Sequence, residues 1–238
     1  MSRSTSRILL WISLFSIAMG FLESAVVIYL REITYPGGFD FPLHPIQGHL
    51  ALTEVLREAA TMIMLLTIAI LAGRTTTEKF AWFLYCFAVW DILYYVFLKM
   101  LIGWPASLFT WDLLFLIPIT WTGPVLAPVL VSFTMILLAI ILVRSTNKIP
   151  TTVIKGTEWI VLITGAFVIF LSLTWDYSTF ILEHYSFREI WTVPKNDLFN
   201  LSLQYIPVKF NWILLGAGEW IIFTAITMVW RRTRRPES

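Results

Sequence analysis

Six long apolar segments constrain the fold of this chain more than any other feature. A helix needs about 20 residues to cross the ~30 Å hydrocarbon layer of a bilayer. Segments that meet this length lie at 8–30, 53–72, 80–101, 122–143, 159–175 and 210–230. Only 13% of the residues are charged and the mean hydropathy is +0.78, whereas about a quarter of a typical soluble domain is charged. We therefore predict an all-α fold, with six transmembrane helices in one bundle domain over residues 1–238.

Other protein classes are excluded by the same composition. Cys86 is the only cysteine, so a secreted domain built on disulfides is excluded. The high apolar content excludes a disordered chain. Arg3 and Arg7 precede the first apolar segment, so a signal peptide is the alternative interpretation of this segment. The apolar run resumes after Glu23 and reaches Leu30, which favours a membrane helix.

The distribution of basic residues predicts the orientation. Loops on the cytoplasmic side of a membrane protein carry an excess of Lys and Arg. Most of the 17 basic residues lie on one side if both termini are cytoplasmic. The cluster Arg231–Arg235 indicates contact with anionic lipid headgroups and does not indicate nucleic-acid binding. We predict an integral protein of the plasma (inner) membrane, with both termini in the cytoplasm and membrane lipids as partners.

The acidic residues show the opposite distribution. Most of the 15 Asp and Glu residues, and all three His residues, lie in the apolar segments or on the predicted outer side. The outer connections are also the long ones, at 31–52, 103–118 and 176–206, and we expect them to be irregular and partly helical. Within 103–118 we expect a short turn followed by an interfacial or re-entrant helix that Pro118 ends. A polar site in this protein would therefore open outward.

Carboxylates at membrane depth are the main candidates for that site. Burying an ionised side chain in the bilayer costs about 2.5–3.5 kcal/mol, so each one needs a partner, water, a cation or a proton. The five are Glu23, Glu54, Glu58, Asp91 and Glu219. Glu54, Arg57 and Glu58 share one helix face by their spacing. Both acids also have a purely structural interpretation. Glu54 could stabilise the N-terminus of its helix, and Glu58 could form an ion pair with Arg57 or Lys99.

Two of these carboxylates lie nearest the middle of the membrane. Asp91 shares a helix face with Tyr95. Glu219 follows Gly216, and small residues at such positions allow two helices to approach closely. We hypothesise that Asp91 and Glu219 meet across the bundle, where two carboxyl groups would share a proton or hold a metal. The alternative for Asp91 is a hydrogen bond that only joins helices.

Together these residues suggest a catalytic site. We hypothesise that Glu58, Asp91 and Glu219 form its acid–base or cation-binding core, because positioned carboxyl groups are suited to general acid–base catalysis. Substrate binding is assigned to Arg57, Lys99, Tyr94, Tyr95 and Glu23. Of these, the two basic residues would hold an anionic group such as a lipid phosphate, and the tyrosines would donate hydrogen bonds.

A divalent metal ion is a further hypothesis. His44 and His49 lie in one outer connection, and Glu54 follows closely. Imidazole and carboxylate groups suit zinc, manganese and iron. The spacing of the two histidines lacks the helical His-Glu-x-x-His pattern. Polar residues at the membrane interface are therefore the alternative interpretation.

Three functions agree with these patterns. The leading hypothesis is a membrane-embedded enzyme that acts on a lipid or another amphiphile from the outer leaflet. A proton- or cation-coupled carrier or channel would use the same carboxylates as a relay. A non-catalytic subunit or assembly factor would use them only to join helices. The sequence contains no P-loop, no Gly-x-Ser-x-Gly motif and no dinucleotide-binding fingerprint, and it does not indicate an oligomeric state.

Overall fold

The computed structural model describes residues 3–45, 48–148 and 154–234. Its long helices are α1 (Arg3–Thr34), α2 (Gly48–Ala72), α3 (Thr76–Ile102), α4 (Leu126–Lys148), α5 (Gly156–His184) and α7 (Trp212–Arg234). All six are long and apolar enough to cross a membrane. A short helix, α6 (Lys195–Ser202), and a 3₁₀ turn, η1 (Glu189–Trp191), lie between α5 and α7. The chain is therefore a multi-pass integral membrane protein, and the prediction of six membrane helices is confirmed.

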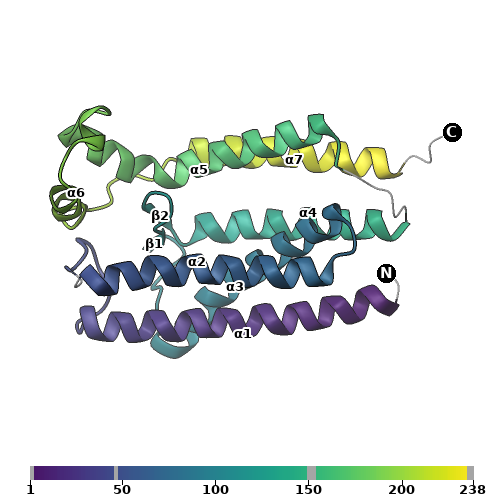
Figure 1. Cartoon of the computed structure of the whole chain (residues 1–238), viewed down its shortest axis with the longest axis horizontal. Coiled ribbons are helices and arrows are strands. Elements are labelled where there is room, and N and C mark those ends of the chain that lie inside the picture. Colours follow the sequence, from purple (N-terminus) through teal and green to yellow (C-terminus); the bar gives the residue numbers. More distant parts are fainter. Residues whose placement is uncertain (1–2, 46–47, 149–153, 235–238) are drawn as a thin grey trace.

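The six long helices lie side by side along the long axis of the molecule (Figure 1). The start of α1 and the end of α7 lie at one end, which we call the termini end. At the opposite end lie α6 and a β-hairpin, and we call this the hairpin end. Helix α3 packs against α1, α2 and α4, whereas α5 packs against α7 and α7 against α4. Part of the predicted basic cluster, Arg231 to Arg234, ends α7, and Arg235 lies outside the described residues.

The β-hairpin contradicts a prediction. Strands β1 (Trp111–Phe115) and β2 (Trp121–Pro124) pair antiparallel, with Asp112 opposite Gly123 and a shift in register before Phe115. The interfacial or re-entrant helix expected here is therefore wrong, and Pro118 lies in the connection between the strands. Two prolines confine this segment and leave little room for a stable helix, while its aromatic residues suit a strand. The fold is mostly helical, but it is not purely α.

Helix boundaries differ from the predicted ones for local reasons. The segment predicted as a helix from residue 122 begins its helix at Leu126, because the preceding residues form β2. Helix α5 continues beyond the predicted end at residue 175 to His184. Helix α7 begins at Trp212, because the side chain of Asn211 accepts a hydrogen bond from the N–H of Leu214 at 3.1 Å. Such a side chain is a typical helix N-cap.

The end of α3 positions the hairpin. Gly103 follows this helix with φ of 70°, in the left-handed region that glycine adopts at little cost. Its N–H donates to the carbonyl of Lys99 at 3.2 Å, and this carbonyl at the helix end would otherwise lack a hydrogen-bond donor. The chain thereby leaves α3 and enters the hairpin, whose second strand packs against α5 and α4.

The core at the termini end is apolar and well packed. Its buried side chains come from all six long helices and include Ile12, Leu65, Cys86, Leu142 and Val229. Burial of apolar area stabilises a fold by about 25 cal/mol per Å², although inside a bilayer close packing replaces part of this driving force. This cluster fills the space between the helices over the half of the bundle nearest the termini.

Candidate functional site

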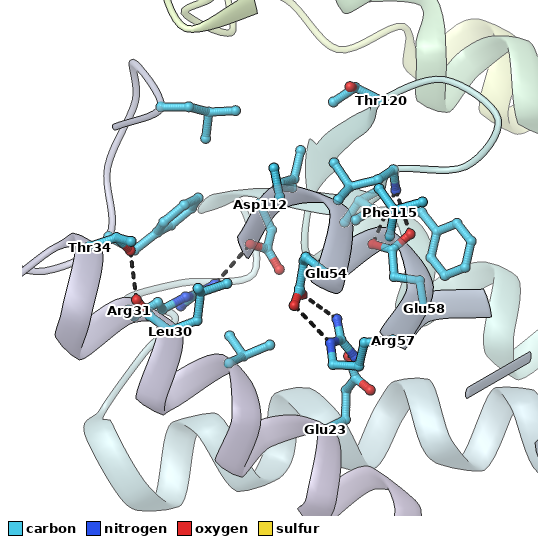
Figure 2. Close-up of a pocket in the computed structure, with 18 of the residues that line it drawn as sticks. Glu23, Leu30, Arg31, Thr34, Glu54, Arg57, Glu58, Asp112, Phe115 and Thr120 are labelled. Carbon is cyan, nitrogen blue, oxygen red and sulfur yellow. Dashed lines mark hydrogen bonds and ion pairs between the residues drawn. The ribbon is translucent and has the colours of Figure 1, made fainter. Parts of the chain in front are cut away.

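A cavity of about 360 Å³ occupies the hairpin end of the bundle (Figure 2). Its walls come from α1, α2, α3, the hairpin, the connection after α1, and α6. The cavity brings together most of the residues that the sequence singles out. These are Glu23, His44, Glu54, Arg57, Glu58, Asp91, Tyr94 and Tyr95.

One wall holds an ion-pair group on Arg57. Its Nε donates to Oε2 of Glu54 at 3.0 Å, its Nη2 contacts the other Glu54 oxygen, and its Nη1 pairs with Glu23 of α1. Figure 2 shows the guanidinium between these two carboxylates. All three nitrogens of Arg57 therefore have a carboxylate partner. The group joins α1 to α2, and it does not present a free cation for an anionic ligand.

A second ion pair lies on the opposite side of the cavity. Nη2 of Arg31 donates to Oδ1 of Asp112 at 3.0 Å, and Tyr95 donates its hydroxyl to Oδ2 at 3.3 Å. The guanidinium also lies over the rings of Phe39 and Trp104, with its central carbon 4.3 Å and 3.9 Å from the ring centroids. Cation–π contacts of this kind stabilise a buried arginine. This pair joins α1 to β1.

Burial affects the protonation of Asp112. The side chain is only 1% exposed, and this loss of water raises the pKa of the carboxyl to about 6, although Arg31 opposes the rise. Sequence reasoning missed this residue. The partners lie 81 positions apart, and no local pattern connects them.

Glu58 has a different environment from Glu23 and Glu54. Its carboxylate accepts the N–H of Leu116, at 2.9 Å and 3.2 Å from its two oxygens, and the residue is 7% exposed. Within the described part of the chain, Glu58 forms no ion pair. Neither structural alternative for Glu58 holds, since Arg57 pairs elsewhere and Lys99 donates to the carbonyls of Gly103 and Pro105. Lys99 also does not line the cavity.

Asp91 also lines the cavity without a basic partner. Its Oδ2 accepts a hydrogen bond from the hydroxyl of Ser132 on α4 at 2.8 Å. Among residues 3–45, 48–148 and 154–234, no Lys or Arg forms an ion pair with it. Asp91 and Glu58 are thus the two lining carboxyl groups that form no ion pair within the described residues.

Glu219 lies apart from this cavity. It accepts a hydrogen bond from Thr134 on α4 at 2.7 Å. Ser132 and Thr134 are two positions apart, which is about 200° around a helix, so the body of α4 separates Glu219 from Asp91. The expected meeting of the two carboxyl groups is therefore wrong. Its small neighbour Gly218 does allow close packing, but against Gly165 of α5.

The structure does not assemble the hypothetical metal ligands. The ring of His44 stacks on Tyr35 at 4.4 Å, and its Nδ1 lies 2.7 Å from the carbonyl oxygen of Thr34. His49 is exposed and does not line the cavity, and Glu54 contacts Arg57. In the described ranges no group of three or more His, Cys, Asp or Glu side chains could hold a metal ion.

The cavity therefore combines two arginines, each in an ion pair, and two carboxyl groups that form no ion pair within the described residues. Apolar residues complete its lining, among them Val27, Leu30, Val55 and Leu203. A concave, mainly apolar pocket with a few convergent polar groups is typical of a site for a small molecule. No family model, curated protein or solved structure matches this chain.

Proposed function

We propose that this protein is a membrane-embedded enzyme that acts on a lipid-like amphiphile inside the cavity. The observation that carries the proposal is that the cavity is closed toward the termini end. Its deepest lining residues are Glu23 on α1, Thr61 on α2 and Trp90 on α3. From Glu23 to the end of α1 the helix spans about 16 Å, at a rise of ~1.5 Å per residue. The cavity thus reaches well into the bundle.

Apolar side chains seal the cavity below these residues. About one turn nearer the termini end lie Met19 on α1, Leu65 on α2 and Cys86 on α3, all buried in one cluster. A carrier needs a polar path that continues to the other side of the membrane, whereas an enzyme needs only a chamber for its substrate. The sealed half of the bundle therefore favours the enzyme.

The chemistry assigned to this chamber is general acid–base catalysis. Such catalysis needs a proton donor and a proton acceptor within hydrogen-bond reach of the substrate. Glu58 and Asp91 suit these roles, because neither is held in an ion pair within the described chain. The Leu116 N–H and the Ser132 hydroxyl fix their orientations. Glu219 takes no part in this proposal.

The proposed orientation follows the positive-inside rule. With both termini in the cytoplasm, the hairpin end faces the outer side and the cavity opens toward the outer leaflet. The apolar lining then accepts the tail of an amphiphile, and the carboxyl groups face its polar head. The membrane in question is, on this proposal, the plasma (inner) membrane.

A conversion assay tests the proposal. Purified protein in nanodiscs is incubated with a total membrane lipid extract, and lipid species are followed by mass spectrometry. We expect the wild type to deplete one lipid class and form a product, and Glu58→Gln and Asp91→Asn to lose this conversion. Glu219→Gln is the matched control, since this carboxyl lies outside the cavity and should leave conversion unchanged.

The other outcomes separate the alternative functions. Accumulation of an unchanged amphiphile on the far side of proteoliposomes would contradict the enzyme and indicate a carrier. Normal wild-type folding without conversion of any lipid class, together with variants that lose only folding yield, would indicate a structural subunit. Size-exclusion chromatography of each variant distinguishes lost chemistry from lost folding.

A further inference from the structure

We infer that the head group of the amphiphile is a cationic amine and not a phosphate; this inference rests on the proposed function. The cavity contains more acidic than basic groups. Five carboxyl groups line it, and two guanidinium groups oppose them. The carboxyl groups are those of Glu23, Glu54, Glu58, Asp91 and Asp112. When all are ionised, negative charge is in clear excess, and a cationic occupant balances it.

Each arginine of the cavity is already paired with a carboxylate. Every nitrogen of Arg57 contacts a carboxylate. Arg31 pairs with Asp112, and aromatic rings cover its faces. Recognition of a phosphate usually depends on free Arg or Lys donors. A phosphate here would meet arginines whose charge carboxylates already balance, and it would be repelled by the other carboxylates of the cavity.

The lining also contains polar groups that suit an occupant. Glu58 is more than nine-tenths buried and forms no ion pair among the described residues. Buried N–H groups of Trp90 and Arg31, both lining residues, have no hydrogen-bond partner in the described part of the chain. Buried polar groups are normally satisfied. A head group with an ammonium group beside a hydroxyl or ether oxygen suits both. The ammonium group donates to the carboxylate, and the oxygen accepts from the N–H groups.

A binding experiment with simple probes tests this inference. Dodecylamine, dodecyl phosphate and dodecanol share one tail and differ in their heads. Each is titrated into the protein in maltoside micelles, and binding is read from the shift in thermal unfolding. We expect dodecylamine to bind tightest, and Glu58→Gln or Asp91→Asn to weaken it by about tenfold or more, because each removes a buried counter-charge. Glu219→Gln should bind it as the wild type does.

The results distinguish failure of the inference from failure of the proposed function. Preference for dodecyl phosphate, or equal binding of all three probes, would overturn the cationic head while the amphiphile site stands. Absence of binding by every probe would count against both. Dodecylamine binding that survives in the Glu58→Gln/Asp91→Asn double variant would show that the cavity charge does not select it. The single variants keep the test valid if the double variant fails to fold.

Discussion

Replacing Arg31 with methionine would leave the Asp112 carboxylate buried without its counter-charge. Both side chains are nearly inaccessible, at 11% and 1% exposed, so water cannot solvate the remaining charge. Removing one partner of a buried ion pair costs about 3–5 kcal/mol, whereas replacing both partners with apolar residues is often neutral. The Tyr95 hydroxyl at 3.3 Å and the backbone N–H of Leu113 would still bond to the carboxylate, but neither carries a charge. We expect Arg31→Met to lose about 3–5 kcal/mol of unfolding free energy at pH 8.

This cost depends on pH in a direction that the structure defines. Burial already places the Asp112 pKa at about 6 in the presence of Arg31, above the ordinary value of ~3.9. An acid with a raised folded-state pKa contributes most to stability at low pH and loses that contribution as pH rises through the folded pKa. Without Arg31 the pKa is higher still. The destabilisation by Arg31→Met should therefore be smaller at pH 5 than at pH 8.

The assay is unfolding by sodium dodecyl sulfate in mixed micelles, followed by circular dichroism. Arg7→Met is the control, because Arg7 is exposed on the same helix and its loss should stay within about 0.5 kcal/mol. The double variant Arg31→Met/Asp112→Leu should recover most of the loss. A single variant as stable as wild type at pH 8, or a double variant as unstable as the single one, would refute the reasoning.

Three further predictions follow from other contacts. Glu58→Ala should destabilise the hairpin by about 1–3 kcal/mol, because it removes the acceptor of the Leu116 N–H, whereas Glu58→Gln keeps that acceptor. Proteolysis at the hairpin measures the difference between the two variants. Gly218→Val should destabilise the protein by about 1–3 kcal/mol, since even a Cβ at this position would lie 2.6 Å from the Ile169 side chain of α5. Gly216→Ala should not destabilise it, because a Cβ there meets open space, and unfolding in detergent compares the two variants. For topology, a membrane-impermeant maleimide should label Ala106→Cys on intact cells, and Thr76→Cys only after permeabilisation; the reverse pattern would invert the proposed orientation.

The membrane helices could be predicted because segment length and apolarity alone determine whether a helix can cross a bilayer. The local part of the ion-pair group was equally accessible, since Glu54 and Arg57 are three residues apart on one helix. Glu23 joins that group across 34 positions, and no local pattern specifies which helices become neighbours. The carboxylates were thus found, but their partners were not.

The hairpin and Glu219 show why the rest of the site was not predictable. Trp, Phe and Leu residues between two prolines are compatible with a short helix or a strand, and pairing with a second strand decides between them. For Glu219, the small residues beside it correctly indicate close packing, but they do not say with which helix. The close neighbour is α5 and not the helix that carries Asp91. In both cases tertiary contacts decide what the sequence pattern leaves open.

An amphiphile in the cavity is the central feature of the proposed function. Photo-crosslinking with an alkylamine that carries a diazirine in its tail, followed by peptide mass spectrometry, tests this claim directly. We predict labels on 51–61 and 112–116, two ranges that contribute to the cavity wall, and we predict that excess unlabelled dodecylamine abolishes them. Labels confined to lipid-facing positions such as Ile63 and Phe223, with no competition by dodecylamine, would contradict it.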